Sequence, residues 1–371
     1  IVYEASDQHN LGEIYGAAHG LEGLLQQDFL DLKRLSAAAW RRIARTPAAA
    51  LGSTRRKLGA EDVQPVLDVF SKYGIRYLFT IGGNDSADNS HEVSLAARDA
   101  GYALTVINVP KTIDNDLVLT DHSPGYGSAA RFVALATIGA GQDAEAMGRA
   151  SPITIIEVMG RDAGWLAASA ALARREERDA PHVICIPEVP VDESQFLGRM
   201  EDAYRRFGFA VAVIAENVRG PNGVMGGQED PWFVDDFGHP YYDGPGRYLA
   251  GLVSRHLKVR TRYEKPGTIQ RSFMANVSRT DAQEAEMAGR AAVRYALAGH
   301  TDQIVTLIRE PGKQYRCTTG LAPLEQVANR VKTMSDEYYD ESTGFVTAEF
   351  ISYARPLIGS PLPRTGRVRT G

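Results

Sequence analysis

The chain has 371 residues, a net charge of −5, 44% hydrophobic residues and 23% charged residues. This length suits two domains, and the composition is that of an ordinary globular protein. Because the charge is acidic and no apolar run reaches the roughly 18 residues of a membrane span, we expect binding to neither nucleic acid nor membrane. The two cysteines, Cys185 and Cys317, lack metal-ligand spacing, so we expect free thiols in a reducing cytoplasm.

The first part of the chain carries a basic turn followed by a helical pattern. Arg55 lies in the sequence Leu-Gly-Ser-Thr-Arg-Arg-Lys at residues 51–57. Such a turn suits a charged surface as well as an anion site. Apolar residues from Val63 to Phe70 then recur at helical spacing, which predicts a helix packed on a sheet.

A Gly-Gly loop follows the first predicted strand. The apolar run at 77–81 reads as a strand, Gly82, Gly83, Asn84 and Asp85 come next, and residues 91–98 have a helix-like pattern. Glycines let a backbone approach an anion, and the N–H groups at a helix start point toward it. The sequence therefore indicates a phosphate site, although many ordinary strand-to-helix turns also carry paired glycines.

A second loop places a lysine and two carboxylates after the next strand. The β-branched run at 103–109 predicts a buried strand, and Pro110 should end it because proline has no N–H to donate. Lys111, Asp114 and Asp116 should then lie beyond the carboxyl end of that strand, where open α/β sheets bind ligands. Lysine can hold a phosphate, while one carboxylate can take a proton and another can bind Mg²⁺. A charged surface loop with an internal ion pair is the alternative.

Two further segments combine strand ends with polar residues. A helix is expected from Gly125 to Ile138, with Ser128 as its cap rather than a sugar-phosphate ligand. The strand at 153–158 runs into Met159, Gly160 and Arg161, before a helix of small residues at 165–173. An arginine at a helix start is electrostatically unfavourable, which favours a functional role for Arg161.

The rest of the chain continues the alternation of strands and helices. Glu216 follows the strand at 209–215, and a carboxylate at a strand's carboxyl end suits a sugar hydroxyl. Residues 219–242 look like an inserted loop, and the tail from Pro356 should be extended. The remaining predicted strands are 182–186 and 303–308, and the remaining predicted helices are 193–207, 246–257, 281–298 and 324–332.

Five motifs in order resemble the phosphofructokinase family: the Gly-Ser-Thr-Arg turn, the Gly-Gly-Asn-Asp loop, the Thr-Ile-Asp-Asn-Asp loop, the Met-Gly-Arg segment and the Pro-Gly-Thr-Ile-Gln-Arg segment at 266–271. The resemblance runs from about Ile14 to Gly359. Lys111 and Asp85 stand where the ATP-dependent branch has glycine, so the chain looks like the diphosphate-dependent branch. Asp85 would repel the α-phosphate of ATP, and Lys111 would attract diphosphate.

The resemblance implies a role for each matched residue. Asp114 would be the catalytic base, and Asp116 would position Mg²⁺ or assist that base. The catalytic Lys111 would neutralise charge on the phosphates, and Mg²⁺ would be held by Asn84, Asp114 and Asp116. Diphosphate would be bound by Arg55, Gly83, Asp85, Lys111 and Thr112. Fructose 6-phosphate would be bound by Thr112, Asp114, Met159, Gly160, Arg161, Glu216, Arg262 and Arg271, with Arg262 reaching across a subunit interface.

The sequence departs from the family pattern at several places. An earlier strand and Gly-rich phosphate loop come first in the family, and we expect that amino-terminal segment to be missing from this sequence, with divergence beyond recognition as the alternative. Asn84 stands where the family more often has a metal-coordinating aspartate, and Pro152 replaces a second interface arginine. Thr268 stands where the family usually has histidine.

We therefore expect an α/β fold with two similar domains of mainly parallel sheet and an active site in the cleft between them. Residues 1–125 and 270–334 should form the diphosphate domain, and 126–269 and 335–371 the fructose 6-phosphate domain. The expected reaction is reversible transfer from diphosphate to the 1-hydroxyl of fructose 6-phosphate, in glycolysis, by a homodimer or homotetramer. The alternatives are a regulatory subunit that binds sugar phosphate without turnover, and an ATP-dependent kinase.

Overall fold

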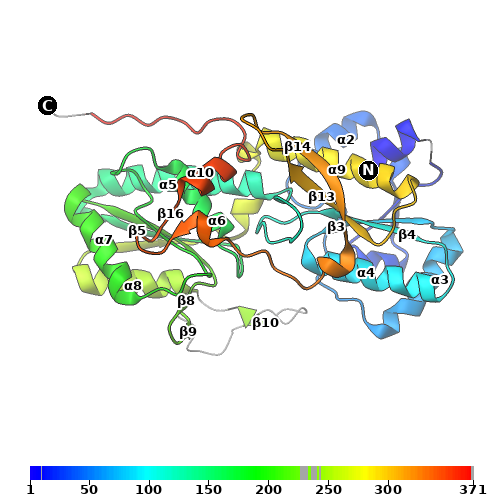
Figure 1. Cartoon of the computed structure of the whole chain (residues 1–371), viewed down its shortest axis with the longest axis horizontal. Coiled ribbons are helices and arrows are strands. Elements are labelled where there is room, and N and C mark those ends of the chain that lie inside the picture. The colour runs from blue at the N-terminus through cyan, green and yellow to red at the C-terminus, as the bar shows by residue number, and fades with distance from the viewer. Residues whose placement is uncertain (10, 226–232, 235–239, 242–243, 369–371) are drawn as a thin grey trace.

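The protein, described here from a computed structural model, is built on two four-stranded sheets with helices packed on them (Figure 1). The structure describes residues 1–9, 11–225, 233–234, 240–241 and 244–368. Among these, no helix combines the length and the apolar character needed to cross a bilayer. The part of the predicted inserted loop at 219–242 that falls on the remaining residues lies outside the described ones.

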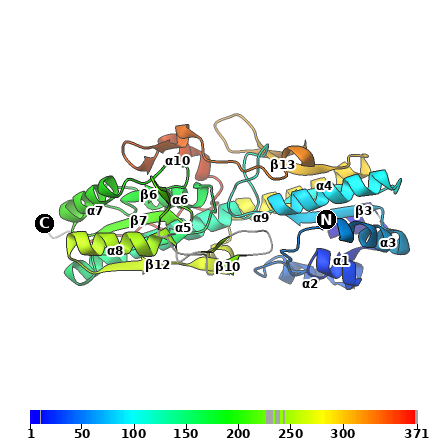
Figure 2. The same ribbon diagram turned by 90° about the horizontal axis from the view of Figure 1, so that it is seen from below.

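The first sheet has the strand order β14-β13-β4-β3. Neighbours β3, β4 and β13 run parallel, and β14 is an antiparallel edge strand. Helices α4 and α9 pack on it, and α3 packs against α4 (Figure 2). The bounds are β3 (Tyr77–Gly82), β4 (Thr105–Pro110), β13 (Gln303–Arg309), β14 (Cys317–Pro323), α3 (Val63–Tyr73), α4 (Asn84–Asp99) and α9 (Arg279–Leu297).

The second sheet has the order β12-β5-β7-β6 and is parallel throughout. Every residue of β5 and β7 is buried, as expected for a parallel sheet covered on both faces. The bounds are β5 (Ile153–Val158), β6 (Val183–Cys185), β7 (Ala210–Ala215), β12 (Thr261–Glu264), α5 (Tyr126–Met147), α6 (Trp165–Ser169), α7 (Glu193–Phe207), α8 (Pro245–Leu257) and α10 (Ala348–Ala354).

Smaller elements lie around these sheets. The amino-terminal part adds a two-stranded ribbon and two helices, and three further ribbons come later in the chain. They are β1 (Tyr15–Ala17), β2 (Phe29–Asp31), α1 (Leu21–Gln26), α2 (Ala37–Ile43), β8 (Arg219–Gly220), β9 (Gly223–Val224), β10 (Phe233–Val234), β11 (Pro240–Tyr241), β15 (Tyr339–Asp340) and β16 (Phe345–Val346).

The two-sheet α/β architecture confirms the predicted fold class, but three local predictions were wrong. The helix expected at 324–332 is only a 3₁₀ turn at Leu324–Gln326, and the following chain leaves the first sheet and crosses to the second (Figure 1). Helix α4 begins at Asn84 rather than at residue 91. The predicted helix at 165–173 is α-helical only to Ser169 and then tightens into a 3₁₀ turn.

Ser128 does not cap α5, because Gly125 occupies the cap position with a φ of 109° that favours glycine. The missing side-chain cap is supplied from α9. Buried Asp281 accepts hydrogen bonds from the backbone N–H of Gly125 at 2.7 Å and of Ser128 at 2.9 Å, and from the Ser128 hydroxyl. Asp281 therefore satisfies helix-start donors from another element.

We predict that Asp281→Ala lowers the free energy of unfolding by about 1–3 kcal/mol, since it leaves buried backbone donors without an acceptor. Urea denaturation measures the change. The control is Asp99→Ala at the exposed end of α4, which should change stability by less than about 0.5 kcal/mol. Equal stability of the two variants would contradict the capping role.

Candidate active site

The two predicted loops emerge side by side from neighbouring strands. β3 and β4 are parallel with Gly82 opposite Pro110, so their carboxyl ends meet at one edge of the sheet. The Lys111 N–H donates to the Gly82 carbonyl at 3.0 Å. Gly83 caps α4 and lies against Lys111 and Thr112. This edge is the position where open α/β sheets bind ligands.

The segment at 111–123, here called the carboxylate loop, is held in its conformation by its own polar side chains. The Thr112 hydroxyl accepts from the Asp114 N–H at 3.1 Å. Fully buried Asn115 adopts the left-handed conformation with φ 58°, where asparagine is one of the few tolerated residues. Its amide donates to the Tyr353 hydroxyl at 2.8 Å and accepts from the Ser123 N–H at 3.0 Å. Asn115 thereby sets the loop that carries Asp114 and Asp116.

Oxygen atoms converge where the two loops meet. The Asn84 side chain donates to Asp116 Oδ2 at 3.1 Å. One further oxygen on each of Asn84, Asp114 and Asp116 is buried without a hydrogen-bond partner. Magnesium prefers carboxylate and amide oxygens and keeps several waters, so this donor set fits Mg²⁺. The predicted metal residues are thus brought together, Asn84 included.

Burial shifts the titration of these groups. Burial, reinforced by the nearby charge of Asp116, raises the pKa of Asp114 to about 7. Burial also raises the pKa of Asp116 and of Glu216. The side chain of Lys111 is accessible to solvent, yet partial desolvation and the positive charge of Arg271 lower its pKa. Asp114 can therefore hold or release a proton near neutral pH.

The second sheet contributes the turn at 159–164, here called the Arg161 turn, which reaches the carboxylate loop. After β5, Gly160 has φ 137° and Arg161 has φ 50°, an unusual conformation for arginine. The Arg161 N–H donates to Glu216 at 3.1 Å. The guanidinium lies 3.9 Å from Asp114 and 3.9 Å from Asp85. Arg161 thus connects the strand ends of both sheets through one side chain.

The Gln-Arg segment closes the other side of this turn. Buried Gln270 accepts from the Met159 N–H at 3.3 Å and donates to the Gly267 carbonyl at 2.9 Å, which ties the segment to the end of β5. Arg271 is exposed, and its charge lowers the pKa of both Lys111 and Asp114. Lys111, Arg161 and Arg271 therefore all act on the carboxylate loop.

Arg262 lies away from the strand ends that carry the site, and no distance places Arg55 within it. Arg262 on β12 is level with Thr154, four residues before the end of β5, and pairs with Asp143 on α5. Arg55 is exposed on the segment at 51–59. For these two, diphosphate and cross-subunit contacts stay predictions.

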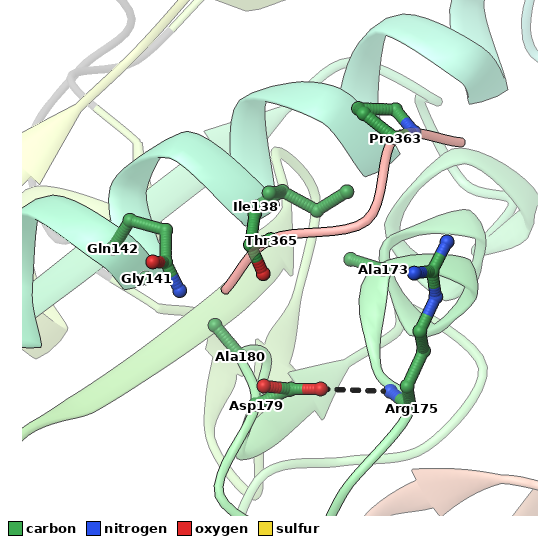
Figure 3. A pocket seen from close by; sticks show the side chains of 9 residues that line it. All are labelled: Ile138, Gly141, Gln142, Ala173, Arg175, Asp179, Ala180, Pro363 and Thr365. Carbon is green, nitrogen blue, oxygen red and sulfur yellow. Dashed lines mark hydrogen bonds between the residues drawn. The ribbon is translucent and has the colours of Figure 1, made fainter. Parts of the chain in front are cut away.

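Two hollows in the described structure lie apart from this site. One of about 20 Å³ lies beneath the carboxyl-terminal segment, where Pro363 and Thr365 pass α5 and Asp179 accepts from the Arg175 N–H at 3.1 Å (Figure 3). Another of about 290 Å³ is lined by Arg262, Asp143 and small residues of α5. Neither includes a carboxylate of the candidate active site.

Sequence reasoning missed residues that support the site from outside the loops. The sequence pattern around Gln270 does not indicate its contact with the end of β5. Glu157 was read as a strand residue, but it is buried and accepts from the Gly246 N–H at 2.8 Å and the Tyr263 hydroxyl at 3.0 Å, beside Lys265 at 2.7 Å. A charged residue inside an otherwise apolar strand was the signal that could have identified Glu157.

Two mainly parallel sheets, whose parallel strands end in a Gly-Gly loop, paired carboxylates and arginines, define an α/β protein with a site for phosphorylated ligands. A family model described as phosphofructokinase matches residues 1–296. The chain belongs to the phosphofructokinase family.

Individual relatives extend this similarity over nearly the whole chain. The chain is 36% identical over 367 residues to a pyrophosphate–fructose 6-phosphate 1-phosphotransferase of Halomonas elongata, covering 96% of this chain and 87% of the relative. It is 37% identical over 374 residues to the enzyme of the same name from Rhodospirillum rubrum, covering 99% and 91%. The crystal structure of a pyrophosphate-dependent phosphofructokinase from Nitrosospira multiformis matches with a TM-score of 0.89 at 33% identity, covering 99% of this chain and 89% of that one.

We predict that Asp114→Asn stabilises the ligand-free protein above pH 7. Because the folded-state pKa of Asp114 is raised to about 7, its contribution to stability is fully present below the ordinary pKa near 4 and is lost as pH rises through 7. At pH 8 in metal-free buffer the variant should be more stable by on the order of a few kcal/mol, since each pKa unit corresponds to about 1.4 kcal/mol.

Urea denaturation at pH 5 and pH 8 measures this difference, which should shrink at pH 5. Asp99→Asn, at the exposed end of α4, is the matched control. A variant that is no more stable than the parent at pH 8 would show that Asp114 titrates normally.

Proposed function

We propose that this chain transfers the terminal phosphoryl group of diphosphate to the 1-hydroxyl of fructose 6-phosphate, reversibly, giving fructose 1,6-bisphosphate. The observation that carries the proposal is the position of Arg161. Its guanidinium lies 3.9 Å from Asp114 of the carboxylate loop and 3.9 Å from Asp85 of the Gly-Gly loop. A sugar held by the Arg161 turn would therefore lie beside both the base and the phosphoryl donor.

Asp114 is the proposed base. Its pKa of about 7 lies near the operating pH, which is where a general base works best. Ionised Asp114 takes the proton of the sugar's 1-hydroxyl as the oxygen attacks phosphorus. In the reverse direction the protonated carboxyl returns that proton. Asp116, which accepts a hydrogen bond from Asn84, is proposed to assist this base as the second carboxylate of the loop.

The surrounding cations position the two anionic substrates. Positioning and charge neutralisation dominate phosphoryl transfer, because little covalent chemistry is left to the protein. Lys111 and Arg55 are proposed for the diphosphate, with Gly83 and Thr112 offering close backbone approach. Arg161, Arg271, Met159, Gly160 and Glu216 are proposed for fructose 6-phosphate. Mg²⁺, held by Asn84, Asp114 and Asp116, would neutralise phosphate charge when bound.

Asp85 supports the choice of diphosphate over ATP. Its carboxylate follows the Gly-Gly turn and lies in the first turn of α4, where a donor's further phosphate would approach. Negative charge there disfavours a nucleotide tail. A small anion with no α-phosphate avoids the repulsion and is attracted by Lys111.

The wider setting belongs to the same proposal. Residues 1–125 and 270–334 would hold diphosphate, and 126–269 and 335–371 the sugar phosphate. We also propose a cytoplasmic homodimer or homotetramer in which Arg262 reaches a neighbour's sugar phosphate. Exposed apolar side chains near Arg271 support self-association: Ile269, Phe273, Met274 and Val277.

The purified chain should catalyse the reaction by itself. We expect turnover with diphosphate at saturating fructose 6-phosphate and Mg²⁺, and essentially none with ATP. Asp114→Asn should lower kcat by roughly 10²–10⁴, the scale of a positioned acid–base group, while Asp99→Asn should leave it unchanged. Initial rates with each donor measure both.

The outcomes distinguish the alternatives. Binding of fructose 6-phosphate without turnover would identify a regulatory subunit. Preference for ATP would identify the nucleotide-dependent kinase. An Asp114→Asn variant that turns over within a few-fold of the parent would exclude Asp114 as the base.

The donor preference should depend jointly on Asp85 and Lys111. Asp85→Gly removes the repulsion toward ATP, and Lys111→Gly removes the attraction for diphosphate. The double variant should shift the ratio of the two kcat/KM values toward ATP by a factor different from the product of the single shifts, since both residues contact one ligand. Asp99→Gly on the same helix is the control. An unchanged donor ratio in Asp85→Gly would contradict this role.

A further inference from the structure

Lys332 lies on the chain segment that crosses between the two sheets. This segment follows the 3₁₀ turn at Leu324–Gln326 and leads to β15, and Figure 1 shows it in orange between the two halves. Lys332 is partly buried there. A lysine drawn out of water needs acceptors for its ammonium group, so its partners show what it holds together.

On one side Lys332 holds the carboxylate loop. Its backbone N–H donates to the Asp116 carbonyl at 2.7 Å. Its ammonium donates to the carbonyls of Thr120 at 3.2 Å and Asp121 at 2.8 Å. Three carbonyls of the loop at 116–121 thus depend on one residue from a distant part of the chain.

On the other side Lys332 holds the start of α6, directly after the Arg161 turn. The Trp165 indole N–H donates to the Lys332 carbonyl at 3.0 Å, and the ammonium lies 5.0 Å from the centre of the indole ring, within cation–π range. Two residues on, the Met334 N–H donates to Glu188 at 2.8 Å, which also accepts from the Gly164 N–H at 2.9 Å. The segment is therefore fastened to this turn twice.

We propose that Lys332 is a positioning residue that sets the carboxylate loop against the Arg161 turn. It touches no substrate. It acts by fixing the distance between Asp114, on the loop, and Arg161, which precedes Trp165 by four residues. Misplacement of reacting groups by about 1 Å can cost 10²-fold in rate, so loss of this bridge should slow phosphoryl transfer without removing a ligand of either substrate.

Lys332→Met tests the bridge, since methionine keeps an unbranched apolar stem and the backbone bonds while removing the ammonium group. We expect kcat to fall by between about tenfold and 10²-fold, with KM for diphosphate and for fructose 6-phosphate within about threefold of the parent. Lys332→Arg should recover most of the lost rate, because a guanidinium can donate to both carbonyls. Lys72→Met is the matched control, because it removes the ammonium group of a lysine on α3 that bonds to Gln27.

Hydrogen exchange supplies a readout that does not depend on turnover. The inference about kinetics rests on the proposed function, but the position of the loop does not. The N–H groups of Asp114 and Ser123 donate to side chains within the loop, and the Asp121 N–H donates to the Leu307 carbonyl of β13. In ligand-free Lys332→Met, peptides covering 113–123 should exchange faster, while those from β5 and β7 should not change.

Trp165→Phe approaches the same bridge from its other end. It removes the indole N–H and keeps an aromatic ring, so we expect a smaller loss of kcat than in Lys332→Met. The fold-loss of kcat in the double variant Lys332→Met, Trp165→Phe should be smaller than the product of the two single fold-losses. The proposal is overturned by unchanged exchange at 113–123 in Lys332→Met, by exchange that rises uniformly over the chain, or by a rise in KM that accounts for the whole loss. If the parent protein shows no turnover but Lys332→Met still raises exchange at 113–123, the bridge is retained and the proposed function is rejected.

Discussion

Two like charges buried in one loop are the constraint on which the candidate site depends. Asp114 and Asp116 are two residues apart, and burial raises the pKa of both. Such an arrangement costs free energy unless cations or hydrogen-bond donors compensate it. Asn84, Arg161 and Lys111 compensate the carboxylates in the ligand-free protein, and they are also proposed to act when substrates are bound.

The compensation is drawn from both sheets, which explains why the site lies where they meet. Asn84 and Lys111 follow strands of the first sheet, whereas Arg161 follows a strand of the second. Both halves therefore contribute to stabilising the carboxylates. Supporting contacts show the same division, since Asn115 bonds to Tyr353 of α10 and the Lys332 segment joins the loop to α6.

Much of the fold could be predicted from the sequence. Two exceptions lie on the segment that crosses between the two sheets. Buried β-branched runs predicted β4, β5 and β7 within two residues, and Asp192 and Gly208 delimit α7 at its predicted ends. Asp114 and Arg161 could be placed after strand ends because the apolar runs before them are clear strand patterns, while their roles stay predictions. The helix expected at 324–332 was wrong because apolar spacing there serves a crossing between sheets, and Lys332 carries no local pattern that distinguishes it from a surface lysine.

The bond between Asn115 and Tyr353 joins residues 238 positions apart. During synthesis the ribosome releases the carboxylate loop long before α10 exists, so the loop lacks this tether while most of the protein is already formed. A nascent chain that ends before Tyr353 therefore lacks one of the hydrogen bonds that hold Asn115, and the loop gains this bond only when α10 docks.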